Sequence, residues 1–208
     1  MTTPDTQHQV RVATGHDTPA VARLIAASFA PLDVSRWLVP PAEARVAVLT
    51  GYFTVHVEHA LRHGQVDVIE MVDGASRMLV AASVWFAVPH PDVAGYEARM
   101  ATVCGAWRPR FRRLEDEMDR AHPRHGGPHA YLAFLATDKR WQNQGLGSTL
   151  LDERHRTLDQ YRLPSYLEAS NGRSRELYLR KGYADCAPVF DLPYDGDPLF
   201  PMWRSGGG

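Results

Sequence analysis

A glycine-containing turn, Gln142-Asn143-Gln144-Gly145-Leu146-Gly147, has the residue types and the position of a phosphate-binding loop. It follows an apolar run, Tyr131 to Thr137, that is typical of a strand, and a helical pattern starts at Leu146. The first amides of a helix have no partner within the helix and lie at the positive end of its dipole, so they bind phosphate. Glycine lets the backbone approach a ligand closely and adopt a positive φ. The pattern therefore predicts a phosphate site at this turn.

A second block of residues supports this interpretation. Leu167-Glu168-Ala169-Ser170-Asn171 reads as a short strand that enters a turn, and Leu177 to Tyr183 reads as a helix end followed by a strand start. Gln142-x-x-Gly145-x-Gly147 resembles the acetyl-CoA motif of the GNAT acetyltransferases, Arg/Gln-x-x-Gly-x-Gly/Ala. The spacing of Asn171, Tyr178, Gly182 and Tyr183 resembles the later motif of that family. The two blocks cover about residues 129–185, and the whole layout is similar to the puromycin N-acetyltransferase-like branch.

The resemblance implies an acetyl-CoA site and a set of residues for it. The expected cofactor-binding residues are Leu135, Ala136, Thr137, Gln142, Asn143, Gln144, Gly145, Leu146, Gly147, Ser148, Asn171 and Tyr178. The loop would hold the diphosphate, with a hydroxyl hydrogen bond from Ser148. The backbone of the strand that ends at Thr137 would pair with the pantetheine arm as an added strand. For Asn171 the alternative is a plain Asx turn. Lys139 stands where many chains of the branch have proline.

Tyr178 is the candidate general acid, because a phenol can protonate the thiolate that leaves when an amine attacks a thioester. The alternative is that Tyr178 only packs against the cofactor. A backbone amide between Leu135 and Thr137 is the natural donor to the oxyanion. Glu168 is the best candidate for the general base. Alternatives are Glu70 or Asp67 acting through water, and His129.

Trp85, Trp37 and Tyr52 are the aromatic residues that we expect near the acceptor, and they suit a bulky, partly apolar amine. We therefore expect an N-acetyltransferase that moves acetyl directly to a primary amine of a small molecule, either a metabolite or an antibiotic-like compound. Neither motif contains cysteine, which disfavours an acetyl-enzyme. The alternatives are acetylation of a protein lysine or N-terminus, and a non-catalytic acyl-CoA-binding module.

The composition is that of a soluble globular protein: 208 residues, 44% apolar and 23% charged, with a net charge of −1. The charge does not indicate nucleic acid or an anionic membrane as a partner. No apolar run is long enough for a membrane span. The two cysteines, Cys104 and Cys186, have no metal-site spacing, so we expect no metal, a reduced setting and a cytoplasmic location. The oligomeric state is left open between monomer and homodimer.

The element pattern predicts a single α/β domain over residues 1–204, with a flexible tail at 205–208. Strands are expected at 10–14, 66–72, 78–88, 130–137, 165–169, 184–191 and 199–204. Helices are expected after Asp17 and over 42–63, 144–161 and 173–181, with breaks at Pro31–Pro41 and 122–128 and a turn at Asp73-Gly74. By resemblance, the fold is a mixed, splayed central β-sheet flanked by helices. An additional helical segment at about 92–122 would cover the acceptor side.

Overall fold

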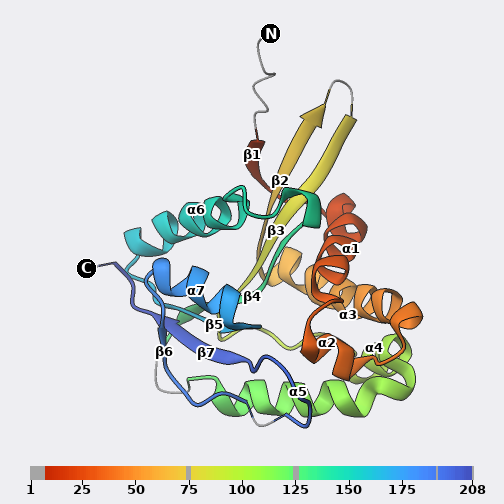
Figure 1. Ribbon diagram of the computed structural model, residues 1–208. Helices are drawn as coiled ribbons and strands as arrows, with labels where there is room; N and C mark the ends of the chain where they lie inside the picture. Colours follow the sequence, from red (N-terminus) through yellow and green to blue (C-terminus); the bar gives the residue numbers. More distant parts are fainter. Residues whose placement is uncertain (1–7, 74–75, 124–126, 191, 208) are drawn as a thin grey trace.

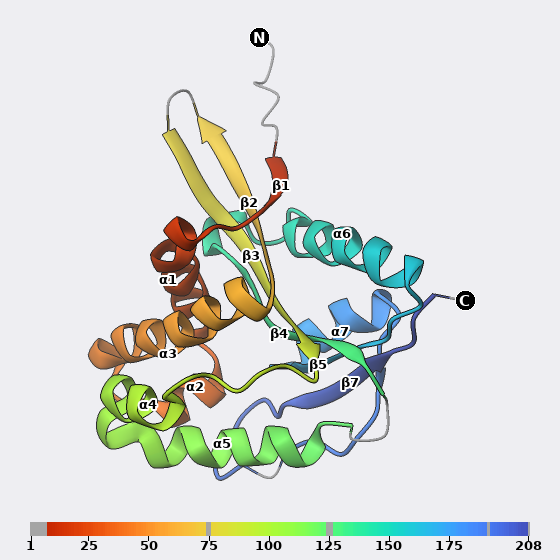
Figure 2. The same cartoon turned by 180° about the vertical axis from the view of Figure 1, so that it is seen from behind.

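The computed structural model describes residues 8–73, 76–123, 127–190 and 192–207. Within these ranges a mixed seven-stranded sheet has the order β1-β2-β3-β4-β5-β7-β6, and helices cover both of its faces (Figures 1 and 2). The strands are β1 (His8–Val12), β2 (Gly64–Asp73), β3 (Ser76–Val88), β4 (His129–Thr137), β5 (Ser165–Ala169), β6 (Ala184–Asp185) and β7 (Phe200–Arg204).

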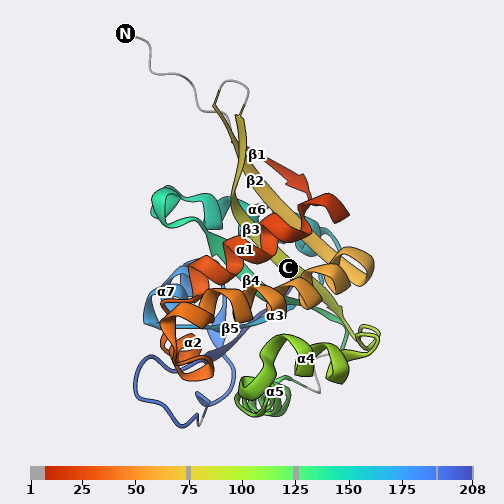
Figure 3. The ribbon, with the colours of Figure 1, turned by 90° about the vertical axis from the view of Figure 1, so that its right-hand side faces the viewer.

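One face of the sheet packs against the helices that precede β4 in the chain, and the other packs against the helices that follow it. The first group is α1 (Thr18–Phe29), α2 (Asp33–Leu38), α3 (Ala42–His63), α4 (Tyr96–Cys104) and α5 (Arg108–Ala121). Figure 3 shows α1 and α3 crossing this face together, with α4 and α5 beyond its lower end. The second group is α6 (Leu146–Gln160) and α7 (Gly172–Arg180), whose apolar residues form separate core clusters with the opposite face.

The sheet splays where β4 meets β5. These two strands are parallel, and only Ala130–Leu132 pair with Ser165–Leu167. Beyond Leu132, β4 continues to Thr137 beside β3 alone. The pairing of β3 with β4 also skips Ala133, a β-bulge that bends the strand. The predicted splayed α/β fold is therefore confirmed.

The additional helical segment is confirmed as α4 and α5, which lie within the predicted 92–122. The predicted break at Pro31–Pro41 is wrong in part, because it contains the short helix α2. The strand expected over 184–191 ends at Asp185. The chain then continues beneath α2, where Asp197 N donates to Asp33 Oδ2 at 3.1 Å and Tyr194 stacks on Trp37. The predicted turn at Asp73-Gly74 lies partly outside the described residues.

The C-terminal residues 205–207 lie against α6, whereas we expected a flexible tail there. The Gly207 amide donates to Asp159 Oδ1 at 2.9 Å, and the same carboxylate pairs with Arg204. A Cβ at Gly206 would come within 2.3 Å of the Arg162 backbone, so only glycine fits at this close approach. The tail is therefore packed as far as Gly207.

Candidate active site

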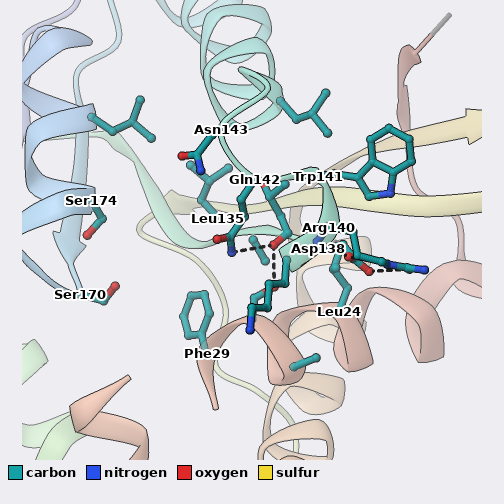
Figure 4. Close-up of a pocket in the computed structure, with 18 of the residues that line it drawn as sticks. Leu24, Phe29, Leu135, Asp138, Arg140, Trp141, Gln142, Asn143, Ser170 and Ser174 are labelled. Carbon is teal, nitrogen blue, oxygen red and sulfur yellow. Dashed lines mark hydrogen bonds and ion pairs between the residues drawn. The ribbon is translucent and has the colours of Figure 1, made fainter. Parts of the chain in front are cut away.

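A groove of about 1190 Å³ begins in the splay between β4 and β5 and runs over the N-terminus of α6. Its walls come from α1, the outer part of the β2–β3 hairpin, the end of β4, the following loop and α7 (Figure 4). Eleven of the twelve predicted cofactor residues line it: Leu135, Ala136, Thr137, Gln142, Asn143, Gly145, Leu146, Gly147, Ser148, Asn171 and Tyr178. Gln144 does not line the groove; its amide nitrogen instead donates to the carbonyl of Arg140.

The loop before α6 presents a row of free amides to this groove. Among the described residues, the backbone amides of 142–148 have no acceptor, and the first amide with one is that of Thr149, which donates to Gly145 O. Asn143 and Gly145 have φ values of 64° and 82°, which curve the backbone around the amides. These free donors lie at the N-terminus of a 15-residue helix, so the loop has the donors and the polarity that an anion needs.

The free edge of β4 forms the inner end of the groove. The Asp138 amide donates to Val80 on β3 at 2.8 Å, and amides alternate sides along a strand. The amides of Leu135 and Thr137 therefore face away from β3, into the splay. The Thr137 carbonyl already accepts from Ser28 Oγ at 3.1 Å and from Gln142 Nε2 at 3.3 Å. The two amides are the donors left for a ligand.

Cationic side chains line the outer groove: Arg23, Arg77, Lys139, Arg140, Arg173 and Arg180. Arg173 was not predicted, although it lies two residues after the recognised Asn171. It lies in the first turn of α7, an unfavourable place for a cation, and donates to Asn143 Oδ1 across the groove. Asn171 itself caps α7, since its Oδ1 accepts from the Ser174 amide at 2.7 Å. Asn171 thus acts as a helix cap, which is more than the plain Asx turn named as the alternative, and a contact with the cofactor stays a prediction.

Tyr178 lies on the α7 side of the splay. It is buried in the core cluster with Leu132 and Leu167, and it lines the groove. Burial raises the pKa of the Tyr178 phenol well above its ordinary value, so the hydroxyl stays protonated. Its ring packs edge-on against Tyr183 at 5.7 Å, and the Tyr183 hydroxyl is held by Ser165 and His155.

Glu168 lies on the other face of the sheet, the face covered by α3 and α5. Its Oε2 accepts from the Tyr131 hydroxyl at 2.8 Å, and its Oε1 is buried without a partner in the described part of the chain. Burial raises the pKa of Glu168 to about 7, against the lowering effect of the hydrogen bond from Tyr131. A carboxylate with this pKa changes its protonation state near neutral pH, as a general base must.

The alternative bases have other partners. Glu70 pairs with Arg11 at 2.5 Å, and that hydrogen bond lowers the pKa of Glu70. Asp67 accepts from Gln65 on its own strand at 2.6 Å. His129 bonds with its two ring nitrogens to His122 and to the Gly127 carbonyl. Of the four candidates, Glu168 has a buried oxygen without a partner in the described structure, although it does not line the groove.

The structure separates the three predicted acceptor residues. Trp85 is fully buried in the core on the α6 face, with its ring 6.3 Å from that of His155, so its expected place at the acceptor is corrected. Tyr52 lies on the opposite face, close enough to Tyr131 to contribute to the raised pKa of that phenol after burial and Glu168. Trp37 is half-buried and stacks on Tyr194 at the same end of the molecule.

The acetyltransferase (GNAT) family model matches residues 97–183, which contain the loop, Glu168 and Tyr178. A crystal structure of the histone acetyltransferase HPA2 and related acetyltransferase from Corynebacterium glutamicum ATCC 13032 is similar over 97% of both chains. It is 26% identical and has a TM-score of 0.70. The chain is supported as a member of the GNAT acetyltransferase superfamily by this model and this structure. It is thus an acetyl-CoA-dependent acyltransferase, as the two motifs predicted. Its membership of the puromycin N-acetyltransferase-like branch stays a prediction.

Two further structures share the fold of this chain at low identity. Mosquito arylalkylamine N-acetyltransferase like 5b is 13% identical with a TM-score of 0.61, over 96% of this chain and 100% of the other. The NatC complex bound to Gag peptide and CoA is 12% identical with a TM-score of 0.54, over 96% and 98%. Their acceptors differ in kind, so the likeness shows the fold alone. None of the helices in the described ranges is long and apolar enough to cross a membrane.

Proposed function

We propose that the acceptor is a primary amine on a small molecule with a bulky apolar part, and that acetyl is transferred to it directly in a ternary complex. The observation that carries this proposal is the arrangement at the splay. Tyr178 approaches from the α7 face and Glu168 from the α5 face, so an acid and a base lie on opposite sides of the sheet. Two reactants that enter from the two faces would meet between them.

The residues of the groove fit coenzyme A. The free amides of 142–148 match an anionic diphosphate, and the amides of Leu135 and Thr137 match the carbonyl groups of an extended arm. When bound, acetyl-CoA supplies an activated acetyl group and a thiolate leaving group. Arg173 and Lys139 add positive charge for the phosphates at the rim.

Proton movement is assigned to two side chains. Glu168 accepts a proton from the incoming ammonium at Oε1, the oxygen that has no partner in the described structure. Tyr178 holds its proton at Oη, where burial keeps it, and donates it to the departing sulfur. The amide of Leu135 or Thr137 stabilises the oxyanion. Positioning of both reactants between these groups supplies the rest of the rate enhancement.

Aromatic side chains on the Glu168 face support an apolar acceptor. Phe29, Phe53 and Phe134 form an edge-to-face cluster on this face, and Tyr52 packs on Phe53. Helix α5 and the segment that contains Tyr194 both contact α2 near these rings. Arg110 of α5 donates to the Trp37 carbonyl, and Tyr194 stacks on the Trp37 ring. These aromatic surroundings favour a small apolar amine over a protein segment, which needs an open groove.

The test is thiol release from acetyl-CoA in the presence of an arylalkylamine, an amino sugar and a lysine-containing peptide. We expect the arylalkylamine to give the highest kcat/KM. Tyr178→Phe is expected to lower kcat about a hundredfold, the usual contribution of a general acid, with coenzyme A affinity unchanged. Tyr161→Phe is the matched control, because Tyr161 is 78% exposed. Binding of coenzyme A without thiol release with any amine would indicate a non-catalytic module, and preference for the peptide would indicate a protein acetyltransferase.

A further inference from the structure

A buried polar cluster surrounds Glu168, and one of its members comes from the additional helical segment. The cluster consists of Glu168, Tyr131, Tyr166, His122 and His129. His122 follows the last residue of α5, which runs beneath the sheet toward β5 and β7 (Figure 2). Its ring lies 4.5 Å from the ring of Tyr166 and 5.2 Å from that of Tyr131. His122 therefore contacts the tyrosine that donates to Glu168 and the tyrosine next to it.

Hydrogen bonds fix the His122 ring in this position. His129 is buried, and its Nδ1 lies 2.8 Å from the Gly127 carbonyl, which can only accept, so Nδ1 carries the proton. In neutral His129 the other nitrogen, Nε2, is then an acceptor. His122 Nε2 lies 2.8 Å from it and must be the donor. The tautomers of both rings follow from one backbone carbonyl.

We propose that His122 is a positioning residue for Glu168. Its hydrogen bond to His129 fixes the side chain against Tyr131 and Tyr166, and this fixed contact keeps the Tyr131 hydroxyl on the Glu168 carboxylate. The inference rests on the proposed role of Glu168 as the general base. It gives α5 a function besides covering the acceptor side, because the end of this helix would set how readily the base takes up a proton.

His122 itself does not titrate in the range where Glu168 does. Burial, and then His129, lower the pKa of His122 to about 4, so the ring is neutral above about pH 5. The other titratable groups that act on His122 are Asp119 and His90. Those that face Glu168 are Tyr131, Tyr166 and Cys186. A change in the pH profile near neutrality in a His122 variant therefore does not report titration of the His122 ring itself.

The experiment compares His122→Phe with His122→Gln in the whole enzyme. Phenylalanine keeps a ring but has no donor for His129, whereas the glutamine amide nitrogen can replace Nε2–H. We expect His122→Phe to move the acid limb of kcat/KM up by about one pH unit. This shift would lower the rate at pH 7 about fivefold, because a smaller fraction of Glu168 is ionised. His122→Gln should keep the wild-type limb, and coenzyme A affinity should be unchanged in both variants.

A double mutant tests whether His122 acts through Tyr131. Adding His122→Phe to Tyr131→Phe should cause no further shift of the limb, because the hydrogen bond is already absent. An unchanged limb in His122→Phe, or additive shifts, would overturn the inference. Should the phenylalanine variant not fold, His122→Leu also withdraws the donor, and the same shift is expected. Full activity in Glu168→Gln would instead refute the proposed base, whatever the His122 variants show.

Discussion

Replacement of Tyr131 by phenylalanine removes one hydrogen bond from Glu168 and leaves the aromatic ring in its place. The bond is 2.8 Å long and its acceptor is a buried carboxylate. Hydrogen bonds to charged groups contribute about 1.5–3 kcal/mol. Because one pH unit corresponds to 1.36 kcal/mol, loss of this bond should raise the pKa of Glu168 by about one to two units. The ionised form loses its donor, so the pKa moves upward.

The assay is the pH dependence of kcat/KM for the best amine of the panel. In the wild type the acid limb should have its midpoint near the Glu168 pKa of about 7, and activity should rise above it. In Tyr131→Phe the midpoint should move to higher pH while the rate at the alkaline plateau is retained. Tyr161→Phe is the control, because its side chain is exposed and does not contact the Glu168 cluster in the described structure. A midpoint that stays in place would refute the assignment of this limb to Glu168.

Three further predictions concern stability and cofactor binding. The raised pKa of Glu168 means that the folded state holds an extra proton between about pH 4.5 and 7, so its stabilising effect is lost as pH rises through 7. Glu168→Gln should then raise the free energy of unfolding at pH 8 by up to about 3 kcal/mol while abolishing activity. Gly145→Ala should lower stability by about 1 kcal/mol because of the positive φ, whereas Gly147→Ala, whose Cβ would meet only ordinary contacts, should not; urea unfolding measures both. Arg173→Gln should raise KM for acetyl-CoA about fivefold, a loss of roughly 1 kcal/mol, and leave KM for acetyl-pantetheine unchanged, since that donor has no phosphate.

Much of the cofactor site could be predicted from the sequence because its parts are local. The strand, the glycine turn and the helix are contiguous, and their backbone amides do the binding. Helix α3 spans 42–63 as predicted, because Pro41 precedes its start and Gly64 follows its end. Arg173 was missed because its partner, Asn143, lies 30 residues away and becomes its neighbour only when α6 and α7 pack side by side.

The acceptor side could be predicted less well, because it depends on which face of the sheet a residue occupies. β3 is apolar from Val80 to Val88 apart from Ser83. Apolar and polar residues therefore do not alternate along it, and the sequence does not indicate which residues lie on which face of the sheet. The bulge opposite Trp85 also changes the register at this point, and Trp85 turns toward α6. Glu168 was selected by its place at the end of its strand. Its partner Tyr131 lies 37 residues away, and His122 packs on Tyr131. Neither contact could be predicted before the fold was known.

The short seam between β4 and β5 has a consequence for the folded state as a whole. Three residue pairs join a four-stranded half of the sheet, β1 to β4, to a three-stranded half, β5 to β7. A pantetheine arm bound along Leu135 and Thr137 would lie between β4 and β5 as an extra strand and would use the hydrogen-bonding groups that β4 leaves unpaired there. Bound coenzyme A would therefore hold the two halves of the sheet together. At a hundred times its Kd it would raise the free energy of unfolding by about 2.7 kcal/mol, and amide exchange would slow in both halves together.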